Sequence, residues 1–152
     1  MKKNVLILCT GNSCRSQMAH GFLSKIAADI EVFSAGTEPA EKINPVAVKV
    51  MAEVGIDISQ HTPHAVSEYI NRTWDYVITV CDNVNENCPV FTGNVGKRIH
   101  IGFDDPSKTV GSDDFIFGEF VRVRDQIKTE MSKFYIVEVK GLRLPHCTCN
   151  DK

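Results

Sequence analysis

The sequence contains no long hydrophobic run and no large excess of charge of either sign. The apolar run Val5–Leu8 is too short for the core of a secretory signal, and no segment is long enough to cross a membrane. Lys and Arg number 17 and Asp and Glu number 19, so a net charge of −2 favours neither nucleic-acid nor membrane binding. We therefore expect a cytoplasmic protein that binds neither nucleic acid nor a membrane.

The sequence also shows no internal repeat, linker or low-complexity segment. Its 152 residues suit one domain with a sizeable core, and 43% hydrophobic with 24% charged residues is an ordinary globular composition. We assign residues 1–140 to a single domain and residues 141–152 to a C-terminal tail that we expect to be mobile. We expect the protein to be a monomer.

Cysteine is abundant for a chain without a secretory signal. A disulfide framework is usual in small secreted proteins, but this chain is long enough to bury a core without cross-links. In a reducing compartment, catalytic, redox or metal-binding roles become the favoured interpretations. The six cysteines are Cys9, Cys14, Cys81, Cys88, Cys147 and Cys149.

Apolar runs alternate with segments of helical spacing along the chain. Buried strands are predicted at Val5–Leu8, Glu31–Ser34, Tyr76–Val80 and Arg98–Ile101. Helices are predicted at Arg15–Ala28, Pro45–Val54 (capped by Asn44), Thr62–Asn71 and Ile116–Phe134, with a loop or weak helix at residues 82–97. This alternation predicts an α/β three-layer sandwich, in which helices flank a four-stranded parallel sheet. Active sites of such sheets lie beyond the carboxyl ends of the strands.

The segment Cys9–Ser16 joins the first predicted strand to the first predicted helix. Its backbone N–H groups can bind an oxyanion, and Arg15 adds a fork of donors suited to a tetrahedral anion. These positive surroundings would favour the thiolate form of Cys9, which is the nucleophilic form. A buried strand-end cysteine is the plainer alternative, but the glycine, asparagine and second serine of the segment favour an anion loop. The predicted anion-binding residues are Thr10, Gly11, Asn12, Ser13, Cys14, Arg15 and Ser16.

Two further residues, Cys81 and Asp105, also follow the carboxyl ends of predicted strands. Asp105 can protonate a leaving oxygen if it faces the anion loop, although a turn aspartate before proline is common. Cys81 can reach Cys9 at the neighbouring strand end, and Cys88 can then resolve the resulting disulfide. The alternatives are two unrelated buried thiols, or a metal site shared with the two tail cysteines, whose Cys-x-Cys spacing is unusual for zinc.

Together these motifs resemble those of the thioredoxin-coupled arsenate reductases of the low-molecular-weight protein tyrosine phosphatase superfamily. The resemblance covers residues 3–135. The phosphatase branch usually has proline where Gln17 stands and tyrosine where Ser107 stands, and it lacks the Cys81 and Cys88 pair. The matching motifs are Cys9-Thr-Gly-Asn-Ser-Cys-Arg-Ser-Gln-Met-Ala, Ser34-Ala-Gly, Asp57-Ile-Ser-x-His61, Thr79-Val-Cys81, Asn87-Cys88-Pro89, Phe103-Asp-Asp-Pro106 and Phe120-x-Arg-Val-Arg-Asp125-x-Ile127.

The resemblance implies reduction of arsenate to arsenite in arsenic detoxification. Cys9 attacks arsenate, Arg15 and the loop hold its oxygens, and Asp105 protonates the leaving hydroxide. Cys81 then attacks Cys9 and releases arsenite, and Cys88 attacks Cys81 to form a disulfide that thioredoxin reduces. The family needs no bound redox cofactor because the thiols supply both electrons, and phosphate or sulfate compete with arsenate for the loop.

Two other functions remain open at this point. A phosphatase would use the same Cys9, Arg15 and Asp105, whereas a non-catalytic arsenite or thiol sensor would need neither the loop nor its acid. Some members of the family bind potassium through Asn12, Ser34 and carboxylates at two further positions. Histidine occupies both of those positions here, which argues against that site, and we expect no metal. These two positions are His20 and His64. We interpret His61 and His64 as structural residues, because nothing in the sequence places either of them near Cys9.

Overall fold

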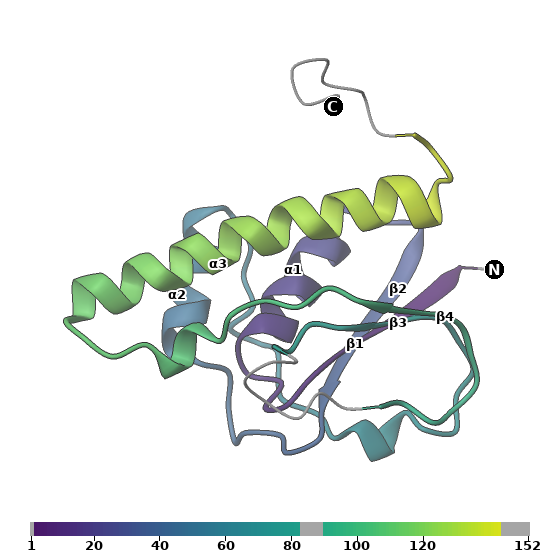
Figure 1. The fold of residues 1–152 in the computed structure, drawn as a ribbon, viewed down its shortest axis with the longest axis horizontal. Helices are drawn as coiled ribbons and strands as arrows, with labels where there is room; N and C mark the ends of the chain where they lie inside the picture. The colour runs from purple at the N-terminus through teal and green to yellow at the C-terminus, as the bar shows by residue number, and fades with distance from the viewer. Residues whose placement is uncertain (1, 83–89, 144–152) are drawn as a thin grey trace.

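The fold is built on a four-stranded parallel sheet with strand order β2-β1-β3-β4 (Figure 1). The computed structural model describes residues 2–82 and 90–143. The predicted α/β fold with four parallel strands is confirmed. The strands are β1 (Lys3–Cys9), β2 (Ile30–Gly36), β3 (Trp74–Thr79) and β4 (Val95–His100), so the fourth strand begins and ends earlier than predicted.

The α-helices of the described residues pack on one side of this sheet (Figure 1). They are α1 (Arg15–Ile26), α2 (Pro45–Glu53) and α3 (Asp113–Phe134), and a π-helical turn, Tyr135–Val139, continues α3. The predicted cap of α2 is confirmed, because the Asn44 side chain accepts hydrogen bonds from the backbone N–H groups of Val46 and Ala47.

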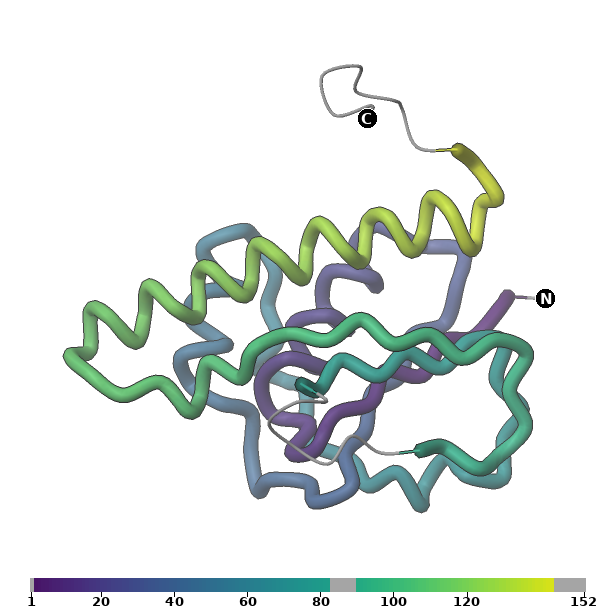
Figure 2. The backbone as a smooth tube through the Cα atoms, in the orientation of Figure 1, coloured from purple at the N-terminus to yellow at the C-terminus, as the bar shows by residue number. Residues whose placement is uncertain are grey.

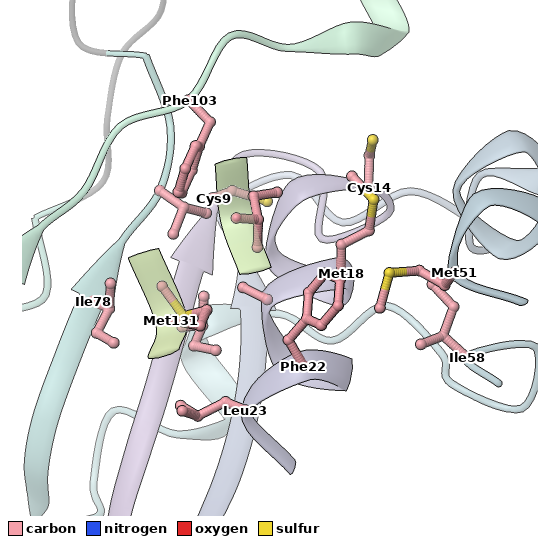
Figure 3. Packing of buried hydrophobic residues seen from close by; sticks show 14 of the residues in the cluster. Cys9, Cys14, Met18, Phe22, Leu23, Met51, Ile58, Ile78, Phe103 and Met131 are labelled. Carbon is pink, nitrogen blue, oxygen red and sulfur yellow. The ribbon is translucent and has the colours of Figure 1, made fainter. Parts of the chain in front are cut away.

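The two faces of the strands carry two separate hydrophobic clusters. Residues 5, 7 and 78 pack towards the helices, whereas residues 6, 8 and 77 pack on the opposite face, as the alternation of a strand requires. Figure 3 shows the helical side, where Met131 of α3 lies between Ile78 of β3 and the α1 side chains Met18, Phe22 and Leu23, all in one cluster. All five of these side chains are buried.

The opposite face is covered by an irregular segment, and the helix predicted at Thr62–Asn71 is wrong. Only a 3₁₀ turn, η1 (Val66–Glu68), forms there. The residues before it are extended because His64 accepts a hydrogen bond from the backbone of Gly36 and Ala65 forms a parallel bridge with Gly36. Figure 2 shows the resulting layers, with α3 along one side, this segment along the other and the strands between them.

The remaining segments have little regular structure where they are described. Residues 90–94 precede β4 without forming a helix, and residues 141–143 are irregular. The rest of the predicted tail, and residues 83–89 with Cys88, lie outside the described residues. Within the described part of the chain, no helix combines the length and the hydropathy needed to span a membrane.

Candidate active site

A single pocket brings together the carboxyl ends of the strands and the segment after β1. It is lined by six of the seven predicted anion-binding residues, from Thr10 to Arg15, and by Cys9. Ser16 is fully buried and does not line the pocket. The other residues that line the pocket are Asp105, Glu38, Asp82, Asp104, Ser107 and Lys108.

The sulfur of Cys9 lies at the base of this pocket and accepts polar contacts from two sides. The backbone N–H of Asn12 donates to Cys9 Sγ at 3.2 Å, and Ser16 Oγ lies 2.9 Å from the same sulfur. Ser16 Oγ also accepts a hydrogen bond from Asn12 Nδ2 at 2.8 Å, so Asn12 holds the hydroxyl that contacts the sulfur. These two contacts hold the Cys9 sulfur in a fixed position at the pocket.

The loop backbone turns its carbonyl oxygens away from the pocket. Thr10 O accepts from Glu38 N, Gly11 O accepts from Ala40 N, and Ser13 O accepts from Asn44 N, each at 2.9 Å. A trans peptide is planar, with its C=O and N–H pointing in opposite directions. The N–H groups that follow these carbonyls are therefore turned towards the pocket, where that of Asn12 reaches the Cys9 sulfur and those of Gly11 and Cys14 can bind an oxyanion.

Asn12 fixes the centre of the loop. Its backbone is left-handed, with φ of 51°, a conformation that asparagine tolerates better than most residues. Its side-chain Oδ1 accepts a hydrogen bond from the backbone N–H of His64 at 2.8 Å. No sequence motif placed His64 near Cys9, but in the structure the backbone of His64 supports the loop.

Arg15 and Asp105 meet at the pocket. Arg15 is 3% exposed, its Nη1 donates to Phe103 O at 3.2 Å, and its Nη2 lies 3.4 Å from Asp105 Oδ2. The other carboxylate oxygen of Asp105 accepts from the backbone N–H and the hydroxyl of Ser107, at 3.0 Å and 2.6 Å. One oxygen of Asp105 is thus held in place while the other faces the arginine and the anion loop.

The cysteines are in different states. Cys9 and Cys14 are free thiols, and burial, reinforced by the negative charge of Asp105, raises the pKa of Cys14 well above its usual value. Cys81 is buried and disulfide-bonded, and its partner is neither of those two thiols. The backbone bond from Val80 N to Leu8 O at 2.9 Å aligns the ends of β3 and β1, so Cys9, the last residue of β1, and Cys81, just after β3, lie at neighbouring strand ends. Cys88, Cys147 and Cys149 lie outside the described residues.

A group of three histidines lies behind the loop. His20 Nδ1 lies 2.9 Å from Ser34 Oγ, and the rings of His20 and His61 are 4.7 Å apart. Burial, followed by the charges of His61 and His64, lowers the pKa of His20 to about 4, so its imidazole is neutral near pH 7. Among the described residues, no three His, Cys, Asp or Glu side chains are grouped so that they could hold a metal ion.

Comparison with known proteins assigns the chain to a family and to a group of relatives within it. Residues 4–143 match the family model of low molecular weight phosphotyrosine protein phosphatase. Arsenate reductase 2 of Staphylococcus haemolyticus is 47% identical over 134 residues, which cover 88% of this chain and 96% of the relative. An arsenate reductase of Halalkalibacterium halodurans is 45% identical over 134 residues, covering 88% of this chain and 95% of the relative.

The fold agrees with these sequence matches. A solved structure of an arsenate reductase in the phosphate binding state superposes with a TM-score of 0.73 at 32% identity, covering 87% of this chain and 95% of the other. The chain belongs to the low molecular weight phosphotyrosine protein phosphatase family, in which it groups with the arsenate reductases.

Proposed function

We propose that this protein reduces arsenate to arsenite in the cytoplasm, acting as a monomer with thioredoxin as its electron donor, and so serves in arsenic detoxification. The observation that carries the proposal is the free Cys9 sulfur at the base of an anion loop, next to a strand end that carries the disulfide-bonded Cys81. The choice of arsenate as the substrate is supported by the relatives that are named arsenate reductases.

The first step is attack of the Cys9 thiolate on the arsenic atom of arsenate. The loop N–H groups and the Arg15 guanidinium bind the arsenate oxygens, since both are donors directed at the pocket. A sulfur–arsenic bond forms, a hydroxide leaves, and Asp105 in its protonated form supplies the proton that makes it water. Arsenic remains pentavalent in this adduct.

The second step transfers two electrons. The Cys81 thiolate attacks the Cys9 sulfur, the sulfur–arsenic bond breaks with its electron pair moving to arsenic, and trivalent arsenite leaves. Two thiols have then become one disulfide, which balances the reduction of arsenic. Cys88 attacks Cys81 and releases the Cys9 thiolate, and the dithiol of thioredoxin reduces the remaining disulfide. A free Cys9 beside a disulfide-bonded Cys81 is the state that this order predicts after arsenite has left.

Weak phosphatase activity should accompany the reductase, because phosphate has the charge and shape of arsenate and the nucleophile is the same. The pocket nevertheless suits a small inorganic anion better than an aryl phosphate. No aromatic residue is found among the described residues that line it, and its rim instead carries the carboxylates of Glu38, Asp82 and Asp104. Inorganic phosphate and sulfate are the expected competing ligands.

The test is arsenate-dependent NADPH oxidation with thioredoxin and thioredoxin reductase, run beside a glutaredoxin control. Cys9→Ser should abolish both this activity and hydrolysis of p-nitrophenyl phosphate, since both need the thiolate. Cys81→Ser and Cys88→Ser should abolish arsenate turnover yet leave the hydrolysis largely intact. Loss of hydrolysis in both resolving variants, or arsenate turnover that survives without Cys81, would refute the proposed division of roles.

A further inference from the structure

Gln17 follows the anion loop on α1 and is almost completely buried, at 1% exposure. Its side chain makes three polar contacts. Nε2 donates to Asn12 O at 3.1 Å and to Thr62 O at 3.3 Å, and Oε1 lies 2.8 Å from His61 Nδ1. Gln17 therefore joins the centre of the anion loop to the extended segment on its far side, using every polar atom of its amide.

These contacts fix the tautomer of His61. The two carbonyl oxygens can only accept hydrogen bonds, so the nitrogen of the Gln17 amide must face them and its oxygen must face His61. An oxygen is an acceptor, so the proton of the imidazole must be on Nδ1. Burial lowers the pKa of His61, and the bond needs only this neutral tautomer. His61 thus holds the Gln17 amide in the one orientation that donates to the loop.

The contact with Asn12 O determines where the next amide points. Asn12 C=O and Ser13 N–H belong to the same planar peptide and point in opposite directions. Gln17 holds the carbonyl on the buried side of the loop, so the Ser13 N–H is turned to the other side, where Ser13 lines the pocket. The bond also adds to the contacts that hold Asn12 in its left-handed conformation.

We propose that Gln17 is a positioning residue for oxyanion binding, which holds the peptide between Asn12 and Ser13 with its N–H towards the ligand, and that His61 acts through Gln17 by fixing its amide. The proposal rests on the proposed function only in treating the loop as an oxyanion site. Gln17 itself does not line the pocket. Its removal should weaken binding of the anion, and so raise KM, more than it slows the step after binding.

The experiment measures how much inorganic phosphate is needed to protect Cys9 from alkylation by iodoacetamide. Gln17→Met keeps the length of the side chain and removes its hydrogen bonds, and it should raise the half-protecting concentration about tenfold, as expected when one hydrogen bond to an anion is lost. KM for arsenate should rise by a similar factor with a smaller change in kcat. The matched control is Gln126→Met, which makes the same substitution at an exposed position of α3.

Two further variants separate positioning from simple support of the fold. Gln17→Glu keeps an acceptor for His61 but places oxygen against Asn12 O, so it should weaken phosphate binding at least as much as Gln17→Met. His61→Phe should give a smaller effect in the same direction, and the double variant Gln17→Met/His61→Phe should match Gln17→Met alone, because His61 acts only through the amide.

The proposal would be overturned if the folded Gln17 variants needed the same half-protecting phosphate concentration as the wild type, whatever the thermal stability of these variants. An additive double variant would overturn the role of His61. Phosphate protection is measured without arsenate turnover, so a protein that protects as expected but does not reduce arsenate would contradict the proposed function and leave this inference standing.

Discussion

Replacing Gly36 by alanine should displace the anion loop. Gly36 ends β2 and lies opposite Cys9 in the β1 register. A Cβ at this position would lie 2.3 Å from Thr10 O and 3.0 Å from Asn12 N. Ordinary C···O contacts begin at about 3.3 Å, so the backbone must retreat by about 1 Å. Both obstructing atoms are backbone, so no side chain can turn aside to make room.

The size of the effect follows from this required movement. Thr10 O is bonded to Glu38 N and cannot shift without straining that contact. Overpacking of this kind costs about 1–3 kcal/mol of unfolding free energy. A displacement of about 1 Å at reacting groups costs on the order of 100-fold in rate. We therefore expect kcat/KM for arsenate to fall about 100-fold and phosphate to lose its protection of Cys9.

The assay pairs urea unfolding, followed by the fluorescence of the buried Trp74, with the thioredoxin-coupled reaction. The matched control is Gly118→Ala in α3, where an added Cβ meets nothing within 4 Å. That substitution should raise the unfolding free energy by about 0.5–1 kcal/mol and leave activity unchanged. If Gly36→Ala behaves like Gly118→Ala in both measurements, the close approach of β2 to the loop does not set the loop geometry.

The other predictions concern titrating groups. Iodoacetamide at pH 7 should modify Cys9 well before Cys14, whose pKa burial raises, and peptide mapping that finds Cys14 labelled first would contradict this. Burial lowers the pKa of His20 from 6.5 to about 4, so the unfolded chain binds more protons than the folded one between these pH values. The unfolding free energy should therefore fall as pH drops through this range, by up to about 3 kcal/mol. In urea unfolding, His20→Phe should show a smaller fall than the wild type, and equal falls in the two proteins would refute this role of His20. The hydrogen bond from Lys140 lowers the pKa of Asp29 from 3.8 to about 2, so the stability that Asp29 contributes is present above pH 4 and lost towards pH 2. Asp29→Asn should therefore unfold at a lower urea concentration than the wild type at pH 7, and the difference between the two midpoints should shrink below pH 4. A difference that stays constant with pH would contradict this role of the ion pair.

Features set by neighbouring residues were predictable from the sequence. The apolar run Val5–Leu8 predicts a central strand because only a strand buried on both faces is uniformly apolar, and β1 is that strand. Asn44 before Pro45 predicts a helix start because both residues act within one turn. The Cys9 loop was predictable because its donors are consecutive in sequence and face one pocket.

Features set by distant contacts were not predictable. The Thr62–Asn71 helix fails because the backbone of this segment pairs with Gly36 and bonds to the loop, and these partners outweigh the local start signal Thr62-Pro63. The support given by Gln17 depends on Thr62 and His61, which lie more than forty positions along the chain. No local pattern marks such contacts, since they exist only once the sheet has formed.

The most direct test of the account is a single turnover of the fully reduced protein with arsenate and no thioredoxin, followed by acid quenching and disulfide mapping. The thiol relay predicts one arsenite per protein, a disulfide between Cys81 and Cys88, and a free Cys9. Cys88→Ser should instead stop at a disulfide between Cys9 and Cys81. Arsenite that appears while Cys81 remains a thiol, or a wild-type product in which Cys9 is still oxidised, would contradict the thiol relay.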